Sequence, residues 1–335
     1  MRRALILAVL LALGLAGCGE KHEAVTAAPG ASQSLTLMLD WVPNADHVGL
    51  YQALAEGDFS HAGLDVHVQV PSDPASPLAL LATGRVDAAI SYEPEVLLAR
   101  NQGHPLVSVA AIVQEPLTSI VSIGSKHIRT VADLKGKRVG DAGIPYQHAY
   151  LTTILAHAGL PPSSVKEINV GANLVPAMLS GRTDATLGAY WNVEALELAA
   201  LHKRPNVIHM QQVGVPDYDE LVVVVRKNTI VNHPDLVRRF VQALARGYES
   251  ARTDPQAAVE NLVKASPGVD PKLALAGVRA SLTAFFPAKA GLPWGWQDPA
   301  QWTAYGQWML GHHLISDPNA VLDASTNELL AGQGP

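Results

Sequence analysis

The sequence predicts an α/β fold with two lobes, a hinge and a ligand cleft between the lobes. From Leu35 to about residue 220, short apolar segments typical of strands alternate with segments typical of helices. Such alternation indicates a parallel-rich sheet covered by helices on both faces. It occurs in two successive runs, the second of which starts near Lys126. Two runs predict two lobes, and two crossings between lobes make a hinge that can close around a ligand.

The first run begins soon after the N-terminal region. Residues 64–70 alternate apolar and polar side chains, as a half-buried strand does, and residues 45–56 have a helical pattern. The other candidates in this run are strands at 35–39, 88–91, 107–113 and 118–123 and a short helix at 77–82.

The second run follows the same plan and ends in a helical tail. Thr130 is a candidate N-cap for a helical turn. The further candidates are a strand at 137–140, a helix at 147–158, continued alternation at 167–170, 175–179 and 185–187, a buried strand at 221–226, and helices at 233–251, 255–264, 271–282 and 300–314. We therefore expect lobe one to comprise residues 34–120 and 221–335, and lobe two to comprise residues 121–220.

Residues 1–17 have the pattern of a secretory signal peptide. A positively charged start is followed by an apolar segment, which is shorter than a membrane span requires, and by small residues before Cys18. Residues 15–18, Leu-Ala-Gly-Cys, resemble a bacterial lipobox, which implies cleavage before Cys18 and lipid attachment to its sulfur. An ordinary signal peptide is the alternative. Cys18 is the only cysteine, so no internal disulfide is possible, and residues 18–33 have the composition of a flexible tether.

The composition and the motifs argue against several classes of function. The chain has 335 residues, 48% of them hydrophobic and 16% charged, and its formal net charge is -6. No long basic segment occurs, so no nucleic-acid partner is expected. Neither G-x-S-x-G nor H-E-x-x-H occurs, and His312 and His313 lack an acidic or cysteine partner at ligand spacing. We therefore expect no catalytic residue, no metal and no cofactor.

The first candidate binding segment is residues 40–44, Asp-Trp-Val-Pro-Asn, at the end of a strand. In open α/β sheets, ligands bind beyond the carboxyl ends of strands and at helix N-termini. Trp41 offers a flat surface for stacking, and Asn44 offers both a donor and an acceptor. His47, in the first helical turn, should stay neutral and hydrogen-bond a ligand. The structural alternative is that Asn44 caps the helix and Trp41 fills the core.

Two other strand ends supply further candidates. Tyr92 and Glu93 follow the strand at 88–91, and Tyr92 is preferred because an acidic residue is also favoured at a helix start. In lobe two, Tyr146 follows the turn at 143–145, whose backbone N–H groups are expected to face the cleft.

Residues 188–194, Gly-Ala-Tyr-Trp-Asn-Val-Glu, have the most unusual composition in the chain. They place Tyr190, Trp191 and Glu194 together after a strand. A carboxylate beside aromatic rings suits an aminopyrimidine, which stacks and donates from its exocyclic amine and from a protonated ring nitrogen. Alternatively, the two aromatic side chains fill the core and Glu194 lies on a helix surface. Trp294 and Trp296 either line the cleft or close a helix junction.

Four segments resemble the thiamine-pyrimidine-synthase-like (SsuA-like) family of solute-binding proteins. They are residues 40–44 with His47 and Gly49, and residues 84–88, 133–140 and 188–194. The D-W-x-P-N and Y-W-N-x-E elements are the most selective, and they are similar to the branch that binds thiamine pyrimidine precursors for ABC importers. The resemblance covers about residues 35–320. It implies a type II periplasmic-binding-protein fold with the ligand between Trp41 and Asn44 on one side and Tyr190 and Glu194 on the other.

The resemblance therefore implies a binding protein and not an enzyme. It would be a monomeric extracytoplasmic lipoprotein, anchored to a bacterial membrane through Cys18, that delivers a formylaminopyrimidine or hydroxymethylpyrimidine to an ABC-transporter permease. Riboflavin, another heterocycle or a sulfonate is the alternative ligand. The family also contains a synthase that makes the thiamine pyrimidine from pyridoxal phosphate and its own histidine. Its cofactor lysine and its histidine align with Ser91 and Glu95 here, and its cysteine-rich segment is missing, which disfavours that reaction.

Overall fold

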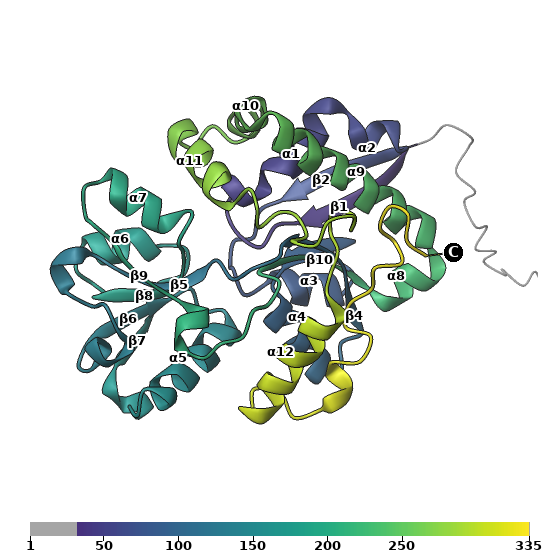
Figure 1. Ribbon diagram of the computed structural model, residues 1–335. Coiled ribbons are helices and arrows are strands. Elements are labelled where there is room, and N and C mark those ends of the chain that lie inside the picture. The colour runs from purple at the N-terminus through teal and green to yellow at the C-terminus, as the bar shows by residue number, and fades with distance from the viewer. Residues whose placement is uncertain (1–31, 335) are drawn as a thin grey trace, which may run out of the picture. The chain divides into compact units, whose positions relative to one another are not determined.

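The computed structural model describes residues 32–334, which form two five-stranded sheets with helices packed around them (Figure 1). The predicted signal peptide, Cys18 with its predicted lipid, and nearly all of the predicted tether lie outside the described residues. Within residues 32–334, no helix combines the length and the apolar character that crossing a membrane requires.

The two sheets share one topology. The first has the strand order β2-β1-β3-β10-β4 and the second the order β7-β6-β8-β5-β9. In each, one strand is antiparallel to both of its neighbours: β10 in the first sheet and β5 in the second. The strands are β1 Gln33–Met38, β2 Leu64–Gln69, β3 Ala88–Ser91, β4 Leu106–Val113, β5 Thr118–Ser122, β6 Arg138–Asp141, β7 Lys166–Asn169, β8 Ala185–Tyr190, β9 Asn206–His209 and β10 Leu221–Arg226.

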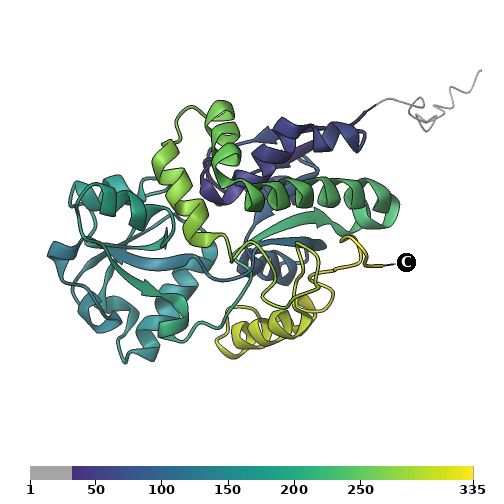
Figure 2. The ribbon, with the colours of Figure 1, turned by 45° about the horizontal axis from the view of Figure 1, so that its top comes forward.

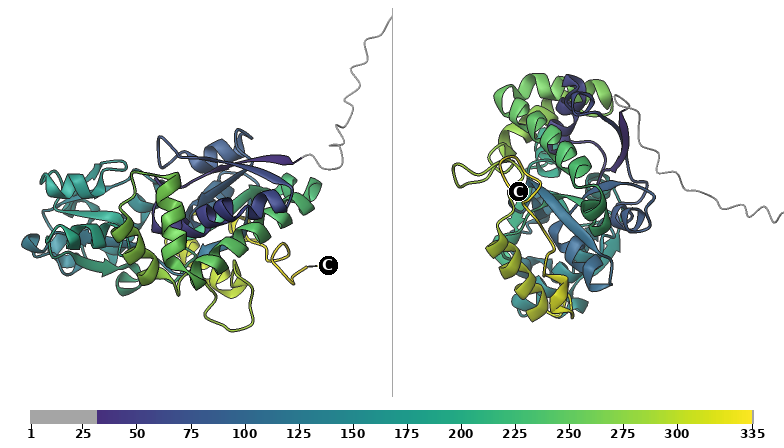
Figure 3. Two further views of the ribbon diagram at one scale, coloured as in Figure 1. Left: turned by 90° about the horizontal axis from the view of Figure 1, so that it is seen from above. Right: turned by 90° about the vertical axis from the view of Figure 1, so that its right-hand side faces the viewer.

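The helices of the C-terminal tail pack back onto the first sheet's lobe. Helix α9 packs along α1 and α2, and α10 packs on α1, as the long green helix beside the purple ones shows in Figure 2. Figure 3 shows α12 on the opposite side of the first sheet from α9. The α-helices are α1 Val48–Glu56, α2 Asp58–His61, α3 Pro77–Ala82, α4 Glu93–Asn101, α5 Pro145–His157, α6 Leu174–Leu179, α7 Glu194–Ala200, α8 Lys227–Asn232, α9 Pro234–Thr253, α10 Pro255–Ala265, α11 Pro271–Ser281 and α12 Pro299–Gly311. The 3-10 helices are η1 Ala45–His47, η2 Gly124–Lys126, η3 Val131–Leu134, η4 Pro162–Ser164, η5 Met210–Val213 and η6 Pro318–Ala320.

The strands form where the residues favour a fully buried sheet. Strand β10, Leu-Val-Val-Val-Val-Arg, consists mainly of β-branched residues, and all but its arginine are buried. The bounds of β3, β10 and α3 match the predicted segments, and the α/β class is confirmed. The predicted helix at 45–56 is instead a 3-10 turn, η1, followed by α1.

The crossings between the sheets lie close to the predicted limits of the lobes. The predicted limit after residue 120 falls inside β5, which belongs wholly to the second sheet. We therefore propose residues 114–117 as the first crossing, while the return before residue 221 coincides with the start of β10.

Candidate ligand-binding site

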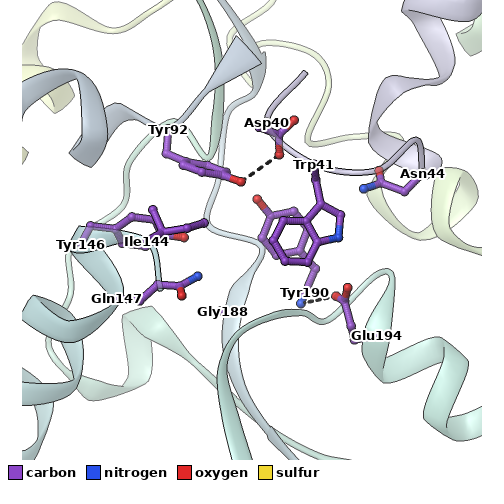
Figure 4. Close-up of a pocket in the computed structure, with 10 residues that line it drawn as sticks. All are labelled: Asp40, Trp41, Asn44, Tyr92, Ile144, Tyr146, Gln147, Gly188, Tyr190 and Glu194. Atoms are coloured by element: carbon purple, nitrogen blue, oxygen red, sulfur yellow. Dashed lines mark hydrogen bonds between the residues drawn. The ribbon is translucent and has the colours of Figure 1, made fainter. Parts of the chain in front are cut away.

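A pocket lies where the carboxyl ends of strands from the two sheets meet. Its empty space is ≈ 300 Å³, of which the centres of water-sized molecules can occupy ≈ 20 Å³, so its walls stand close together. Trp41 projects into the space between the walls in Figure 4. The lining residues are Asp40, Trp41, Asn44, Tyr92, Ile144, Tyr146, Gln147, Gly188, Tyr190 and Glu194.

The wall from the first lobe is organised around Asp40. The Tyr92 hydroxyl donates to Asp40 Oδ2 at 2.9 Å, and His47 Nε2 lies 2.9 Å from Asp40 Oδ1 (Figure 4 shows the tyrosine contact). The backbone N–H of Asn44 donates to His47 Nδ1 at 3.2 Å, so a neutral His47 carries its proton on Nε2 and donates it to Asp40. The histidine therefore holds the carboxylate in place from behind the pocket.

Asn44 combines its predicted capping role with a place in the lining. Its side-chain oxygen accepts the backbone N–H of Asp46 at 2.9 Å, which caps η1. The oxygen is thus engaged, whereas no described residue accepts a hydrogen bond from the side-chain amide nitrogen of Asn44. That nitrogen is available as a donor to a ligand acceptor.

The opposite wall comes from the end of β8 and the start of α7. Glu194 Oε2 accepts the backbone N–H of Tyr190 at 2.7 Å, which fixes the side chain at the first turn of the helix (Figure 4). Desolvation by the surrounding walls raises the pKa of Glu194 to about 7. Its other oxygen receives no hydrogen bond from any other described residue, so Glu194 retains acceptor capacity toward the pocket.

A third group of lining residues comes from the start of α5. The rings of Tyr92 and Tyr146 lie 5.4 Å apart between centroids, which joins the two lobes by aromatic contact. Gln147 Oε1 accepts the backbone N–H of Ala142 at 2.8 Å. Gly188 has a φ of +98°, and a Cβ there would lie 2.2 Å from Gln147 Nε2, so this position requires glycine.

The hinge is held by one buried carboxylate, Glu220. Its Oε2 accepts the backbone N–H groups of Leu117 and Thr118, each at 2.8 Å, from the other crossing. It also accepts the hydroxyls of Tyr218, Thr118 and, at 3.3 Å, Tyr190. Glu220 therefore ties both crossings together and links them to the pocket wall.

Six of the nine predicted contact residues line the pocket, and three do not. His47 lies behind Asp40, as described above. Glu93 is fully buried under the start of α4, where its Oε2 accepts the backbone N–H of Asp219 at 2.7 Å. Trp191 points away from the pocket, and its Nε1 donates to the Pro116 carbonyl at 3.1 Å. The six that do are Trp41, Asn44, Tyr92, Tyr146, Tyr190 and Glu194.

In the turn at 143–145, the N–H of Ile144, which lines the pocket, has no hydrogen-bond acceptor among the described residues, so it stays a predicted donor, whereas two neighbouring N–H groups are engaged. The N–H of Gly143 donates to Asp141 Oδ1 at 2.7 Å, and the N–H of Tyr146 donates to Glu95 Oε1 at 3.1 Å. Both groups are therefore engaged within the protein. Burial raises the pKa of Glu95 to about 7.

The lining also contains residues that were not predicted as contacts. Asp40 stands in the D-W-x-P-N element and directly follows the predicted strand, so its position gave a usable signal. Ile144 and Gly188 lie in segments already selected, but Gln147 had no sequence signal. Trp294 does not line the pocket, since it is buried and stacks on Tyr248 with centroids 4.8 Å apart. Trp296 lines a separate cavity beside Asp219.

The arrangement can bind a flat, uncharged or cationic molecule. The lining combines four aromatic side chains with two carboxyl groups and contains neither lysine nor arginine. Aromatic faces favour a planar ring, and carboxylates accept hydrogen bonds from its amino groups. No group of three or more histidine, cysteine, aspartate or glutamate side chains within residues 32–334 is placed to hold a metal ion.

Comparison with known proteins identifies relatives by sequence. The family described as "NMT1/THI5 like" matches residues 44–258. The formylaminopyrimidine-binding protein of Halalkalibacterium halodurans is 33% identical over 298 residues, which cover 88% of this chain and 90% of the relative. The 4-amino-5-hydroxymethyl-2-methylpyrimidine phosphate synthase of Schizosaccharomyces pombe is 24% identical over 238 residues, which cover 67% of each chain.

Comparison with solved structures identifies the fold. The alkanesulfonate-binding protein SsuA of Xanthomonas axonopodis pv. citri, solved with bound MOPS, superposes with a TM-score of 0.68 at 18% identity. The match covers 90% of this chain and 100% of that protein. The described residues thus have the two-lobed fold of periplasmic binding proteins, and the predicted fold class is confirmed.

Proposed function

The chain belongs to the NMT1/THI5-like family, and from this premise we propose that it captures a pyrimidine precursor of thiamine for an ABC importer. A solute-binding role is supported by the relative that is 33% identical and by the shared fold. The observation that carries the proposal is the pocket, in which Trp41 and Asn44 from one lobe face Tyr190 and Glu194 from the other.

The chemistry of the lining favours an aminopyrimidine over the other ligands. Its amino groups and ring nitrogens match the free acceptor on Glu194 and the free donor on Asn44, and its flat ring can stack on the aromatic side chains of the walls. Riboflavin has three fused rings and would require the walls to stand further apart than a single pyrimidine ring does. A sulfonate would meet carboxyl groups without a compensating cation.

A synthase reaction lacks the side chains that it needs. Schiff-base chemistry requires an amine, and no lining residue is a lysine. Ser91, which aligns with the cofactor lysine, is buried in β3, and Glu95 holds the backbone of Tyr146. We therefore propose binding and release, without bond-making, as the function.

The location and the partners follow from the same proposal. We propose that the chain works outside the cytoplasm as a monomer, held at a bacterial membrane by a lipid on Cys18, and passes its ligand to a membrane permease. The close walls of the pocket mean that the lobes must separate to admit a ring and close again around it.

Titration calorimetry with a formylaminopyrimidine tests the proposal. Glu194→Gln and Trp41→Ala should each weaken binding by about tenfold or more, which corresponds to about 1.4 kcal/mol. Glu197→Gln, in the same helix but outside the lining, is the matched control and should bind as the wild type does. Unchanged affinity in both pocket variants would show that the ligand binds elsewhere.

A thermal-shift panel then tests which ligand class binds. Aminopyrimidines, thiamine, riboflavin and alkylsulfonates are compared at equal concentration, because a bound ligand raises the melting temperature by mass action. The largest shift is expected with an aminopyrimidine. A larger shift with riboflavin or an alkylsulfonate would overturn the ligand assignment while leaving the binding role intact.

A further inference from the structure

Asn192 and Asp46 form a buried contact between the two lobes, outside the lining of the pocket. Asn192 follows β8, whereas Asp46 belongs to η1 on the other side. Asn192 Nδ2 donates to Asp46 Oδ1 at 2.7 Å and lies 3.1 Å from Ser281 Oγ at the end of α11. All three side chains are almost fully excluded from solvent. The contact therefore exists only while the lobes are together.

Helix α11 seals this contact. A Cβ added to Gly277 would lie 2.8 Å from the carbonyl oxygen of Asn192 and 2.8 Å from the Cβ of Ala45, so the helix backbone touches both lobes. The Ser281 hydroxyl donates to the Gly277 carbonyl at 2.9 Å, which leaves its oxygen to accept from Asn192. Water is excluded from the carboxyl and amide groups on this side.

Each of the two side chains has one oxygen without a partner. Asp46 Oδ2 and Asn192 Oδ1 are both buried, and neither forms a hydrogen bond in the part of the chain that the structure describes. Two buried acceptors without donors are unfavourable, because each has lost its hydrogen bonds to water without replacement. One proton on Asp46 Oδ2 would serve both, because a carboxylic acid and an amide can form two parallel hydrogen bonds.

The charged and titratable groups around Asp46 favour its neutral form. Burial raises the pKa of Asp46 to about 7, and the carboxylates of Asp40 and Glu220 act in the same direction. The hydrogen bond from Asn192 and the adjacent His47 act in the opposite direction. From α7, Glu194 also faces this carboxyl group. From α9, the Tyr248 hydroxyl donates to the backbone carbonyl of Asp46 and leaves the carboxyl group untouched.

We propose that Asp46 takes up a proton when the lobes close and shares it with Asn192, so that the two side chains act as a latch that positions the walls of the pocket. The purpose of the latch rests on the proposed binding function. Its existence does not, because the contact between Asp46 and Asn192 forms between the lobes with or without a ligand. Asp46 and Asn192 are positioning residues that favour the closed state without touching the ligand.

The proton linkage has a definite sign. In the closed state the pKa of Asp46 is about 7, whereas an Asp46 exposed by opening regains an ordinary, lower pKa. Closure therefore binds a proton below about pH 7, and the closed state is favoured as the pH falls. Between pH 6 and pH 8, the ratio of closed to open molecules should change about tenfold through this group.

Distance measurements between spin labels test the latch in the absence of any ligand. Cysteines replace Ser72 and Ala172, which are exposed on facing sides of a groove between the lobes, in the full chain carrying Cys18→Ser. The short-distance population of the otherwise unmodified chain should fall about tenfold relative to the long one from pH 6 to pH 8. Circular dichroism verifies that each variant is folded.

Two variants separate the proton from the contact. Asp46→Asn keeps two amide hydrogen bonds to Asn192 without a titrating proton, so it should lose the tenfold part of the pH response that Asp46 contributes between pH 6 and pH 8. Any response that remains belongs to other interlobe carboxyl groups with raised pKa values, Glu194 and Glu95. Asn192→Leu removes both bonds and should favour the long distance at either pH. A pH response in Asp46→Asn equal to that of the unmodified chain, or no pH response in either, would overturn the proposal. Neither result depends on which ligand the pocket binds.

Discussion

Glu220 at the hinge and Glu194 in the pocket are both acidic residues in surroundings that exclude most water, but they differ in their partners. Glu220 accepts hydrogen bonds from two backbone N–H groups and three hydroxyls. Glu194 accepts one backbone N–H on Oε2 and none from another residue on Oε1. Burial raises the pKa of both carboxyl groups. Burial thus shifts the pKa of both residues in the same direction, and the residues differ in how many of their oxygen lone pairs are still free to accept a hydrogen bond.

The difference indicates which acidic residue serves structure and which serves binding. A carboxylate whose lone pairs are occupied by protein donors has little left for a ligand, whereas one with a free oxygen facing a pocket can accept from a ligand amine. Glu220 also joins the crossing at Leu117 to the crossing at Tyr218, so its loss affects the relation between the lobes. The loss of Glu194 should affect affinity first.

The largest expected effect is on stability, from Glu220→Ala. This change leaves the N–H groups of Leu117 and Thr118 buried without an acceptor, so the free energy of unfolding should fall by about 3–5 kcal/mol. Glu194→Ala is the matched control, and it should cost about 1 kcal/mol because only one backbone donor loses its partner. Urea denaturation followed by circular dichroism measures both.

Equal losses of stability in the two alanine variants would break the comparison. Such a result would mean that Glu194 is as deeply integrated in the fold as Glu220 and is a poor candidate for contact with a ligand. A loss below about 1 kcal/mol for Glu220→Ala would show that water replaces its donors at the hinge.

The sequence predicted the pocket walls because ligand-facing residues in this fold class stand at the ends of strands. Trp41 and Asn44 follow β1, and Tyr190 ends β8 shortly before Glu194. Their place could therefore be derived from the α/β pattern and from the resemblance. Glu220 could not be identified in this way. Its donors at Leu117 and Thr118 lie 103 and 102 residues earlier in the chain, and no local pattern reveals which distant donors converge.

The predictions that failed concern the directions of side chains. Trp191 is adjacent to Tyr190, but successive residues of an extended segment point to opposite sides, so only one of the two can face the pocket. Glu93 adjoins Tyr92 and points under the start of α4 for a related reason. The sequence pattern therefore locates a segment at the pocket. Which of its side chains faces the pocket depends on the exact backbone geometry, which the pattern does not determine for a single residue.

The next largest effect is a fall in stability with rising pH, which sharpens the comparison for Glu194. Burial raises the pKa values of Asp46, Glu95, Glu194 and Asp219 to about 7. The folded state therefore binds more protons than the unfolded state above about pH 4, and the stability that these groups contribute is lost as the pH rises toward about 7. Unfolding free energies from urea titrations should fall from pH 5 to pH 7 by at least about 1 kcal/mol and level off above pH 8.

Glu194→Gln gives the share of this slope that belongs to the pocket. The free energy of unfolding of this variant should fall less steeply with pH than that of the wild type, by up to about 1.4 kcal/mol per pH unit, because one of the groups no longer titrates. The depressed pKa of Asp184, caused mainly by its hydrogen bonds with Arg138, affects only more acidic solutions and leaves this window unchanged. Stability that rises from pH 5 to pH 7 would contradict the assigned directions.

The smallest effect concerns a hydrogen bond that links the hinge to the pocket wall. The Tyr190 hydroxyl donates to Glu220 Oε1 at 3.3 Å, and Tyr190→Phe should cost about 0.5–1 kcal/mol of stability because Glu220 keeps its four other donors. Ligand affinity by calorimetry should change less than about threefold, since the ring surface remains. Tyr218→Phe, which removes a 2.9 Å bond to the same carboxylate outside the pocket lining, is the matched control. If Tyr190→Phe weakened binding about tenfold and Tyr218→Phe did not, the Tyr190 hydroxyl would contact the ligand. Tyr190 would then belong to the hinge and to the binding pocket at once, and the two regions could not be separated at this residue.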